Sequence, residues 1–492
     1  MAATALWAGV LLPQLPIEVL LRGVESPGPT VVVHGRAQAP IVAASNEQAK
    51  SCGVQDGMGL AAALAVIGEL QVLSRNEAAE REALENIAQW AGQFTAMVSI
   101  VESGTAGLVL EIGGSLRLFG DDPKIVGRQL RSGLTELGFS PIIAAAPTPA
   151  AAWWLARSGI QTLIRDVVKM RRRLSKIPID GMDIKASTLD GLWGIGVRTV
   201  GDCEKLPRGD TARRFGPGLH QQLDRAMGRA ADPREPYVPP ERLVRALSLP
   251  SPVASVEAVL FALGRIVREV IGVLISTGRA PQMLELTLTH SNEKTSKLTL
   301  ALIAPSRDAQ HFTGLLRHRL ESFQIHDPIE SLSLVVHESV HLAPSNYDLF
   351  DDGDIQERAG HRGEWLAVIE RLHARLGAER VQAMEIVSDH RPEHAWRAVS
   401  PLEGGSTDND AEVRNRPLWL LPEPKALENS MGQLKYRGHL TLESPAERLE
   451  GGWWTGYDER RDYHIAVNEQ GERFWVYHDK RRLSWHLHGV FA

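Results

Sequence analysis

The chain has 492 residues, a formal net charge of −6 and a hydrophobic fraction of 43%. This length exceeds what one ordinary hydrophobic core supports, so several domains are predicted. The two cysteines, Cys52 and Cys203, have no His or Cys partner close in sequence, which excludes a zinc-finger pattern and a disulfide framework, and no cofactor is expected.

The first 22 residues do not predict a signal peptide, because Pro13, Pro16 and Glu18 interrupt the apolar stretch. The chain contains no run of about 18 apolar residues, so no membrane span is expected. A reducing cytosol is the natural compartment for a chain with so few thiols. We therefore expect a cytoplasmic protein.

The first 150 residues alternate short apolar runs with helical periodicity, which is typical of an α/β or α+β core. Predicted strands cover 6–12, 31–33, 108–112 and 142–146, and predicted helices cover 18–22, 77–90 and 125–137. Residues 150–240 differ, because they are helix-rich, punctuated by glycine and basic. Between Arg165 and Arg242 sixteen Lys and Arg face eleven Asp and Glu. A local basic face can contact phosphates although the whole chain is acidic, and a solvated helix surface is the alternative.

Residues 241–343 predict a compact β-α-β-β-α-β domain. Leu284, Leu286 and Leu288 alternate with polar residues, which indicates a half-buried strand. The remaining elements are expected at 243–249, 256–275, 298–303, 310–323 and 332–336. Beyond Pro344 the pattern predicts one helix at 365–376, a polar loop at 403–415 and a small β-rich module at the end.

The order of these parts resembles the Y-family DNA polymerases, with palm and fingers, a helical thumb and a little finger. Residues 46–54 with Gly57 and Met58 are similar to the family's fingers segment, and residues 110–120 to the strand and turn after its second catalytic motif. The resemblance implies an α+β multidomain fold. It divides the chain into a palm with fingers at 1–165 (fingers about 20–75), a thumb with a helix-hairpin-helix at 166–240, a little finger at 241–343, a clamp-peptide linker and partner-binding region at 344–435, and a β-rich module at 436–492.

Four C-terminal segments are similar to the ImuB family, namely 389–397, 416–424, 452–454 with 461–463, and 487–492. Members of that family are catalytically inactive Y-family homologues in bacterial mutagenesis cassettes. The resemblance implies an association with the nucleoid in the SOS response. It also implies three protein partners: the sliding clamp, an error-prone polymerase III alpha-type subunit and an ImuA-like, RecA-related protein.

The metal-binding carboxylates of an active Y-family palm are missing from the matching positions. Polymerases use two Mg²⁺ ions held by carboxylates. Fitting the chain to the family places Val10 at the first aspartate, and Ala106 and Gly107 at the adjacent acidic pair. A shift by one residue still gives Gly9 or Leu11, and Thr105 or Leu108. Two other acids, Glu18 and Glu102, lie elsewhere in the sequence, so no metal site is predicted.

The positions that bind the triphosphate in the family are also altered. Glu47 and Lys50 stand where the family uses Tyr and Arg, and Glu47 would repel a triphosphate. Thr148 and Pro149 replace an Asn-Lys pair, and Leu15 replaces the aromatic steric gate. Together these changes indicate that nucleotide binding is not maintained.

Two regions are candidate DNA contacts. A hairpin with Gly194 and Gly196 would expose backbone N–H groups to a phosphate, and Arg198 and Thr199 would add contacts; an ordinary inter-helix turn is the alternative. The little-finger pattern would contact the backbone without sequence preference, through His290, Lys294, Lys297, Arg307 and Arg317.

A candidate sliding-clamp peptide, Asn346-Tyr347-Asp348-Leu349-Phe350, follows the last strand of the βαββαβ block. An extended segment of this type inserts Leu and Phe into an apolar pocket. Local packing is the alternative, and residues 416–421 are a rival partner site. The tryptophans and tyrosines of the last 55 or so residues are expected to form mainly a small core; stacking on single-stranded DNA and partner binding are the other possibilities.

The sequence thus predicts a non-catalytic adaptor that binds primer-template DNA and the clamp and recruits a mutagenic polymerase. An active translesion polymerase with relocated metal ligands is the first alternative. A DNA-binding protein with neither a clamp nor a polymerase role is the second.

Overall fold

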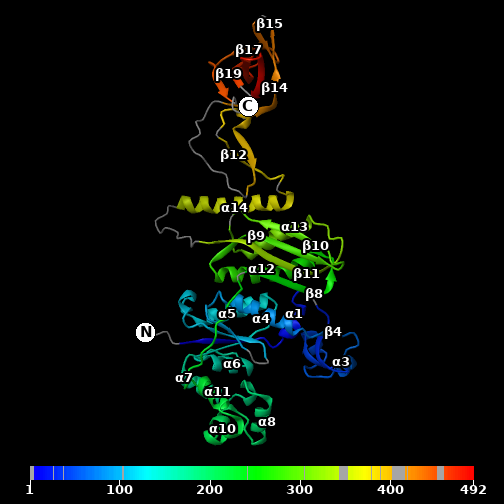
Figure 1. Cartoon of the computed structure of the whole chain (residues 1–492), viewed down its shortest axis with the longest axis vertical. Helices are drawn as coiled ribbons and strands as arrows, with labels where there is room; N and C mark the ends of the chain where they lie inside the picture. Colours follow the sequence, from blue (N-terminus) through cyan, green and yellow to red (C-terminus); the bar gives the residue numbers. More distant parts are fainter. Residues whose placement is uncertain are drawn as a thin grey trace. The chain divides into compact units, whose positions relative to one another are not determined.

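The computed structural model describes residues 5–25, 27–36, 38–101, 105–240, 242–303, 305–342, 353–377, 379–387, 389–401, 416–417, 419–430, 432–451 and 459–491, with backbone alone at 353–364 and 430. These residues belong to two compact units, Met1–Arg375 and Leu376–Ala492. Both contain strands, and unit 1 is rich in helices as well (Figure 1). The predicted α+β fold class is confirmed.

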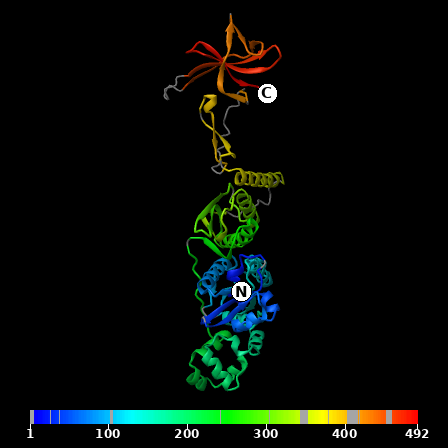
Figure 2. The same cartoon turned by 90° about the vertical axis from the view of Figure 1, so that its right-hand side faces the viewer.

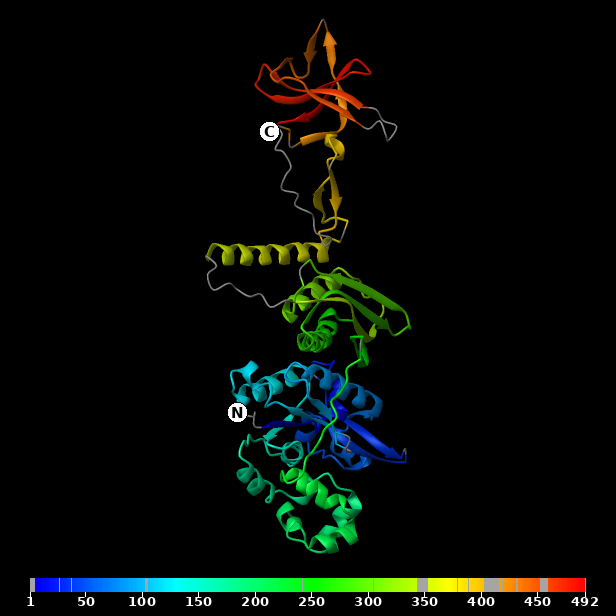
Figure 3. The same ribbon diagram turned by 60° about the vertical axis from the view of Figure 1, so that its left-hand side comes forward.

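A four-stranded antiparallel sheet, the central sheet, organises the first part of unit 1. Its strand order is β5-β6-β1-β7, with β1 at Trp7–Leu11, β5 at Val98–Ile100, β6 at Gly107–Glu111 and β7 at Ile142–Ala146. Apolar residues of α4 (Glu77–Ala91) and α5 (Pro123–Glu136) cover one face, and α6 (Pro149–Arg157) covers the other. Figure 3 shows helices on both sides of these strands. Both faces of the central sheet are therefore buried.

A smaller sheet, with the strand order β3-β2-β4, is formed by strands that come between β1 and β5 in the sequence. It contains β2 (Thr30–Arg36), β3 (Ala39–Ser45) and β4 (Gln71–Ser74), with β4 parallel to β2. Three short helices accompany it: α1 (Leu15–Leu21), α2 (Glu47–Ser51) and α3 (Leu60–Val66). The side chain of Asn46 starts α2 by accepting the Ala49 N–H group, so the predicted fingers motif begins at a helix cap.

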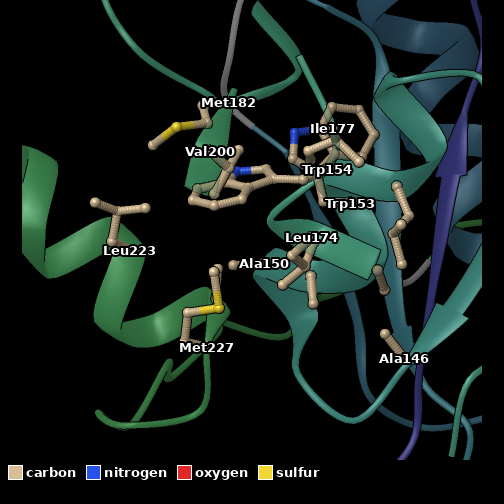
Figure 4. Packing of buried hydrophobic residues seen from close by; sticks show 14 of the residues in the cluster. Ala146, Ala150, Trp153, Trp154, Leu174, Ile177, Met182, Val200, Leu223 and Met227 are labelled. Atoms are coloured by element: carbon tan, nitrogen blue, oxygen red, sulfur yellow. The ribbon is translucent and has the colours of Figure 1, made fainter. Parts of the chain in front are cut away.

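A set of helices follows α6 and shares one hydrophobic core with it. The helices are α7 (Val167–Leu174), α8 (Ala186–Gly194), α9 (Val200–Glu204), α10 (Arg208–Phe215) and α11 (Gly218–Ala226). Figure 4 shows Leu223 and Met227 on one side of this core, with Trp153 and Trp154 of α6 on the other. Helix α6 is thus enclosed between the central sheet and the helices.

The βαββαβ prediction is confirmed by the second four-stranded sheet, the βαββαβ sheet. The elements run β8 (Val244–Val253), α12 (Val256–Ser276), β9 (Arg279–His290), β10 (Thr295–Ala301), α13 (Ala309–Glu321) and β11 (Ile329–His341). The antiparallel strand order is β10-β9-β11-β8, and the leucines of each strand pack on α12 and α13. The alternation of Leu284, Leu286 and Leu288 with polar residues predicted this one-sided burial correctly.

The βαββαβ domain packs against α4 through α12. A Cβ atom at Gly272 of α12 would collide with the ring of Trp90, so this glycine admits the indole. Beside this contact, Arg22 Nη2 donates to Glu269 Oε2 at 2.5 Å, and the two side chains are 4% and 1% exposed. Burial of such a pair is tolerated only when both charges are matched, which makes the contact dependent on both residues.

Helix α14 (Gly353–Leu376) closes unit 1, where the carboxylate of Glu370 accepts the Ile303 N–H group and pairs with His311. Unit 2 begins with a two-stranded hairpin, β12 (Ala383–Ile386) and β13 (Trp396–Val399). An eight-stranded sheet follows, in orange and red in Figure 2, and confirms the β-rich ending. Its strands are β14 (Trp419–Ala426), β15 (Glu428–Ser430), β16 (Gln433–Lys435), β17 (His439–Leu442), β18 (Glu447–Gly451), β19 (Glu459–Asn468), β20 (Arg473–Asp479) and β21 (Ser484–Val490). In the part of the chain that the structure describes, no helix is long and apolar enough to cross a membrane.

Candidate nucleic-acid interface

The positions matched to the catalytic acids do not lie on one face of the central sheet. Val10 pairs with Leu108, and its side chain packs in the cluster with α4 and α5. Gly107 pairs with Leu11 and faces Trp153 of α6. Because side chains alternate along a strand, Leu11 shares the α6 side with Gly107 and Val10 does not. Val10 thus fills one hydrophobic core, and Gly107 faces the other.

Ala106 lines a surface pocket of about 660 Å³ that also touches Leu15 and Thr105. The pocket wall carries charge, but Glu80 is held by Arg75 through two hydrogen bonds of 2.7 and 2.8 Å. The remaining charged lining residues are Glu77, Arg81 and Glu85. No three His, Cys, Asp or Glu side chains among the described residues are placed to hold a metal ion. Glu102 lies outside the described residues.

The residues at the positions that bind the triphosphate in the Y family either have structural roles here or lie near other charged side chains. Thr148 caps α6 by accepting the Ala151 N–H group at 3.2 Å, and Leu15 is fully buried. Glu47 and Lys50 line a second pocket of about 260 Å³ together with Glu18. Burial raises the pKa of Glu18, against the opposing effects of Ser140 and of nearby cations. The pocket therefore brings together acids as well as cations.

The glycine hairpin lies between α8 and α9, as predicted, and its tip is exposed. Gly196 has a φ of +86°, and nothing lies within 4 Å of a Cβ atom at Gly194 or Gly196. The N–H groups of 195–197 bond to carbonyls of α8, however, and the Thr199 N–H group bonds to Asp202 in a capping box. Arg198 is exposed and donates to the Trp193 carbonyl at 2.8 Å. Arg198 is thus an exposed charged side chain beside the tip of this hairpin.

The face of the βαββαβ sheet opposite α12 and α13 is open and rich in hydroxyl groups. The strand register aligns three cross-strand rows on this face. They are Thr295-Thr289-Ser331-Ser248, Lys297-Thr287-Ser333-Ala246 and Thr299-Glu285-Val335-Val244. These side chains are exposed or half-buried, whereas the leucines between them are buried except for the half-buried Leu298. Short hydroxyl side chains on a flat surface can donate hydrogen bonds to phosphate oxygens without selecting bases.

The five cationic candidates of this domain are not equivalent. Lys297 lies on the open face, where its Nζ bonds to Glu285 Oε1 at 2.9 Å and lowers the pKa of that carboxyl. Lys294 is exposed in the turn between β9 and β10, and Arg317 is exposed on α13. His290 is buried and bonded to Ser296 and the Asp327 carbonyl, and Arg307 donates to the Arg279 carbonyl. His290 therefore belongs to the domain's interior.

The candidate clamp peptide, residues 346–350, lies outside the described residues. In the rival segment, Arg416 bonds to Glu447 at 2.8 Å, and Trp419 is 70% exposed. Tyr463, Trp475 and Tyr477 are buried in the β-rich module, with the Tyr463 and Trp475 rings stacked at 4.1 Å. These three aromatic residues form a core, as expected, while Trp453 and Trp454 lie outside the described residues.

The sequence did not predict several side-chain pairings that the structure shows. Arg22 and Glu269 are 247 residues apart, and no local pattern links them. Unit 2 holds another such group: His488 bonds to the hydroxyl of Tyr463 at 2.8 Å, and burial lowers the pKa of His488 to about 4. By contrast, Ser and Thr alternate with Leu in β9 and β11, and this pattern indicates the open face from the sequence.

Comparisons with known proteins agree with the predicted family. A family model described as the impB/mucB/samB family matches residues 25–157. Protein ImuB of Caulobacter vibrioides (strain NA1000 / CB15N) is 27% identical over 472 residues, 89% of this chain and 100% of that protein. DNA polymerase IV of Yersinia pestis (strain Pestoides F) is 23% identical over 234 residues, 45% of this chain and 62% of that protein.

Solved structures similar to this chain include DinB from Sulfolobus solfataricus, with 15% identity and a TM-score of 0.38 over 69% of this chain and 100% of that one. An insertion ternary complex of Dbh DNA polymerase has 16% identity and a TM-score of 0.39 over 67% of this chain and 98% of that one.

Residues 25–157 thus form an impB/mucB/samB domain within a mixed architecture of helices and strands. The chain as a whole is an ImuB homologue, since the similarity to Protein ImuB extends over nearly the whole of both chains.

Proposed function

We propose that this protein is a non-catalytic adaptor of translesion DNA synthesis. It binds primer-template DNA without sequence preference and brings a mutagenic polymerase to it. The observation that supports this role is the contrast within unit 1: Val10 and Gly107, at two of the positions matched to catalytic acids, lie in hydrophobic cores, while the βαββαβ sheet keeps an open, hydroxyl-rich face. The family's partners (the sliding clamp, an error-prone polymerase III alpha-type subunit and an ImuA-like protein) are included in the proposal through the ImuB similarity.

The first experiment separates an adaptor from a polymerase. The purified full-length protein is given a primer-template, all four dNTPs and Mg²⁺ or Mn²⁺, with an active Y-family polymerase as the positive control. We expect no extension. Extension that is lost when Glu80 or Glu85, beside Ala106, is changed to Gln would establish relocated metal ligands and refute the adaptor role.

The second experiment measures DNA binding as a function of salt. Binding through phosphates releases counterions, so affinity falls steeply with salt concentration and does not depend on base sequence. Fluorescence anisotropy with two unrelated primer-templates should give equal affinities and equal salt slopes. Absence of binding at low salt would remove the DNA-bound part of the proposal.

The third experiment tests the clamp peptide. The double variant Leu349→Ala/Phe350→Ala should lose retention of the purified clamp in a pull-down, because the two apolar anchors of such a peptide carry most of its binding energy. The matched control is Trp419→Ala in the rival segment, which should leave retention unchanged. Loss with the control variant alone would move the clamp site to the segment around 416–421.

A further inference from the structure

Helix α6 lies directly on the central sheet at two glycines. A Cβ atom at Gly9 of β1 would be 2.5 Å from the Ala152 carbonyl oxygen and 2.8 Å from the Trp153 nitrogen. A Cβ atom at Gly107 of β6 would be 2.5 Å from the Val10 carbonyl oxygen and would overlap Cζ3 and Cη2 of the Trp153 ring. Neither position has room for any side chain larger than hydrogen.

The position of α6 is held from several directions, so it cannot simply give way. Thr148 starts the helix and donates to the Ala226 carbonyl of α11 at 2.9 Å. The Ala150 N–H group donates to Asp232, and Arg157 near the other end donates to the Met182 carbonyl. Trp153 itself is 2% exposed and packs in the core that α6 shares with the following helices (Figure 4). Interiors of this density transmit a local clash instead of absorbing it.

We propose that Trp153 is a plug that closes the sheet face where the second acid of the adjacent pair would project. This inference rests on the proposed function and deepens it: catalysis is excluded by the packing of α6, in addition to the replacement of acidic side chains. A carboxylate at position 107 meets an aromatic ring in a dry core, so it is both overpacked and desolvated. An acid restored at position 107 without removing the indole therefore has no room to reach a metal ion.

The decisive test is a double-mutant comparison of thermal stability. Gly107→Glu is made in the natural chain and in a Trp153→Leu background. Leucine is used because it keeps an apolar side chain in the core, where Trp153→Ala could leave too large a cavity for the chain to fold. The control is Gly127→Glu on α5, where nothing lies within 4 Å of an added Cβ atom. We expect Gly107→Glu to lower the melting temperature by about 5 °C or more in the natural chain, to lower it much less beside Leu, and the control to change little in both backgrounds.

Equal losses of melting temperature in both backgrounds would overturn the plug and leave the adaptor proposal intact. A second readout compares Mn²⁺ binding by Val10→Asp/Ala106→Asp with binding by the triple variant that adds Gly107→Glu, both with Trp153 in place. We expect the third acid to add no affinity, and tighter binding by the triple variant would also overturn the plug. By contrast, primer extension by the natural chain would refute the proposed function itself, so the two failures are distinguishable.

Discussion

The two four-stranded sheets of unit 1 differ in what covers them. The central sheet is buried on both faces, by α4 and α5 on one side and by α6 on the other. The βαββαβ sheet is covered on one face by α12 and α13 and leaves its other face to solvent. A sheet enclosed on both sides is a structural core, whereas an antiparallel sheet with one solvated face can serve as a binding surface. Under the proposed function, the open face of the βαββαβ sheet would contact DNA, whereas the central sheet contributes to stability.

The largest expected effect on stability comes from the buried ion pair between Arg22 and Glu269 of α12. Replacing Glu269 by Ala leaves Arg22 buried without its partner, and Arg245, whose pKa burial already lowers, loses its nearest anion. We expect a loss of about 3–5 kcal/mol in the free energy of unfolding, measured by urea denaturation.

The matched control replaces both charges, as Arg22→Met/Glu269→Leu. Similar apolar volume at these two positions should recover the part of the loss that comes from unpaired Arg22, while the part that comes from Arg245 remains. If Glu269→Ala costs less than about 1 kcal/mol, the contact between α12 and α4 does not depend on this ion pair.

The local sequence pattern predicted most elements of both sheets, although not strand β5 (Val98–Ile100), and it did not predict what packs on them. Strand β7 was predicted with the bounds it has, Ile142–Ala146, and the alternation in β9 identified its buried side. The face occupied by Val10 could not be read in the same way, because its strand is apolar on both sides and a one-residue shift reverses it. Contacts such as Trp153 on Gly107 depend on how distant elements pack, and periodicity carries no information about them. The sequence could thus predict that the acids are missing at the matched positions, but not that α6 covers this face of the central sheet.

The tight packing of the central sheet predicts an unusual cost for a small change. Gly9→Ala places a methyl group against the backbone of α6, so we expect a loss of about 1–3 kcal/mol in the free energy of unfolding. The control Gly127→Ala lies within α5 with open space around it and should instead stabilise the chain by about 0.5–1 kcal/mol, because alanine favours a helix. A neutral Gly9→Ala would show that the face under α6 is looser than its distances indicate.

For the open face of the βαββαβ sheet we expect the opposite behaviour. A substitution there should leave stability unchanged and weaken DNA binding. Thr287→Glu adds a negative charge to the middle row, beside Lys297 and Ser333. We expect unchanged melting but DNA affinity weaker by about tenfold at low salt, from like-charge repulsion of phosphates. The same substitution at exposed Gln310 of α13, off this face, should leave affinity unchanged. Equal effects at both positions would indicate that net charge alone decides binding.

The smallest expected effect concerns the ion pair between Glu285 and Lys297 on that open face. Glu285 holds Lys297 at 2.9 Å and also lies 3.7 Å from His337 Nε2. Glu285→Gln should release Lys297 toward a phosphate and increase DNA affinity by about threefold or less, since exposed pairs of this kind are weak. The gain should disappear in the Lys297→Ala background, and the salt dependence of binding should fall by about one phosphate contact when Lys297 is removed from the Gln variant. If Glu285→Gln acts equally with and without Lys297, the gain comes from the lost negative charge, and Lys297 does not contact DNA.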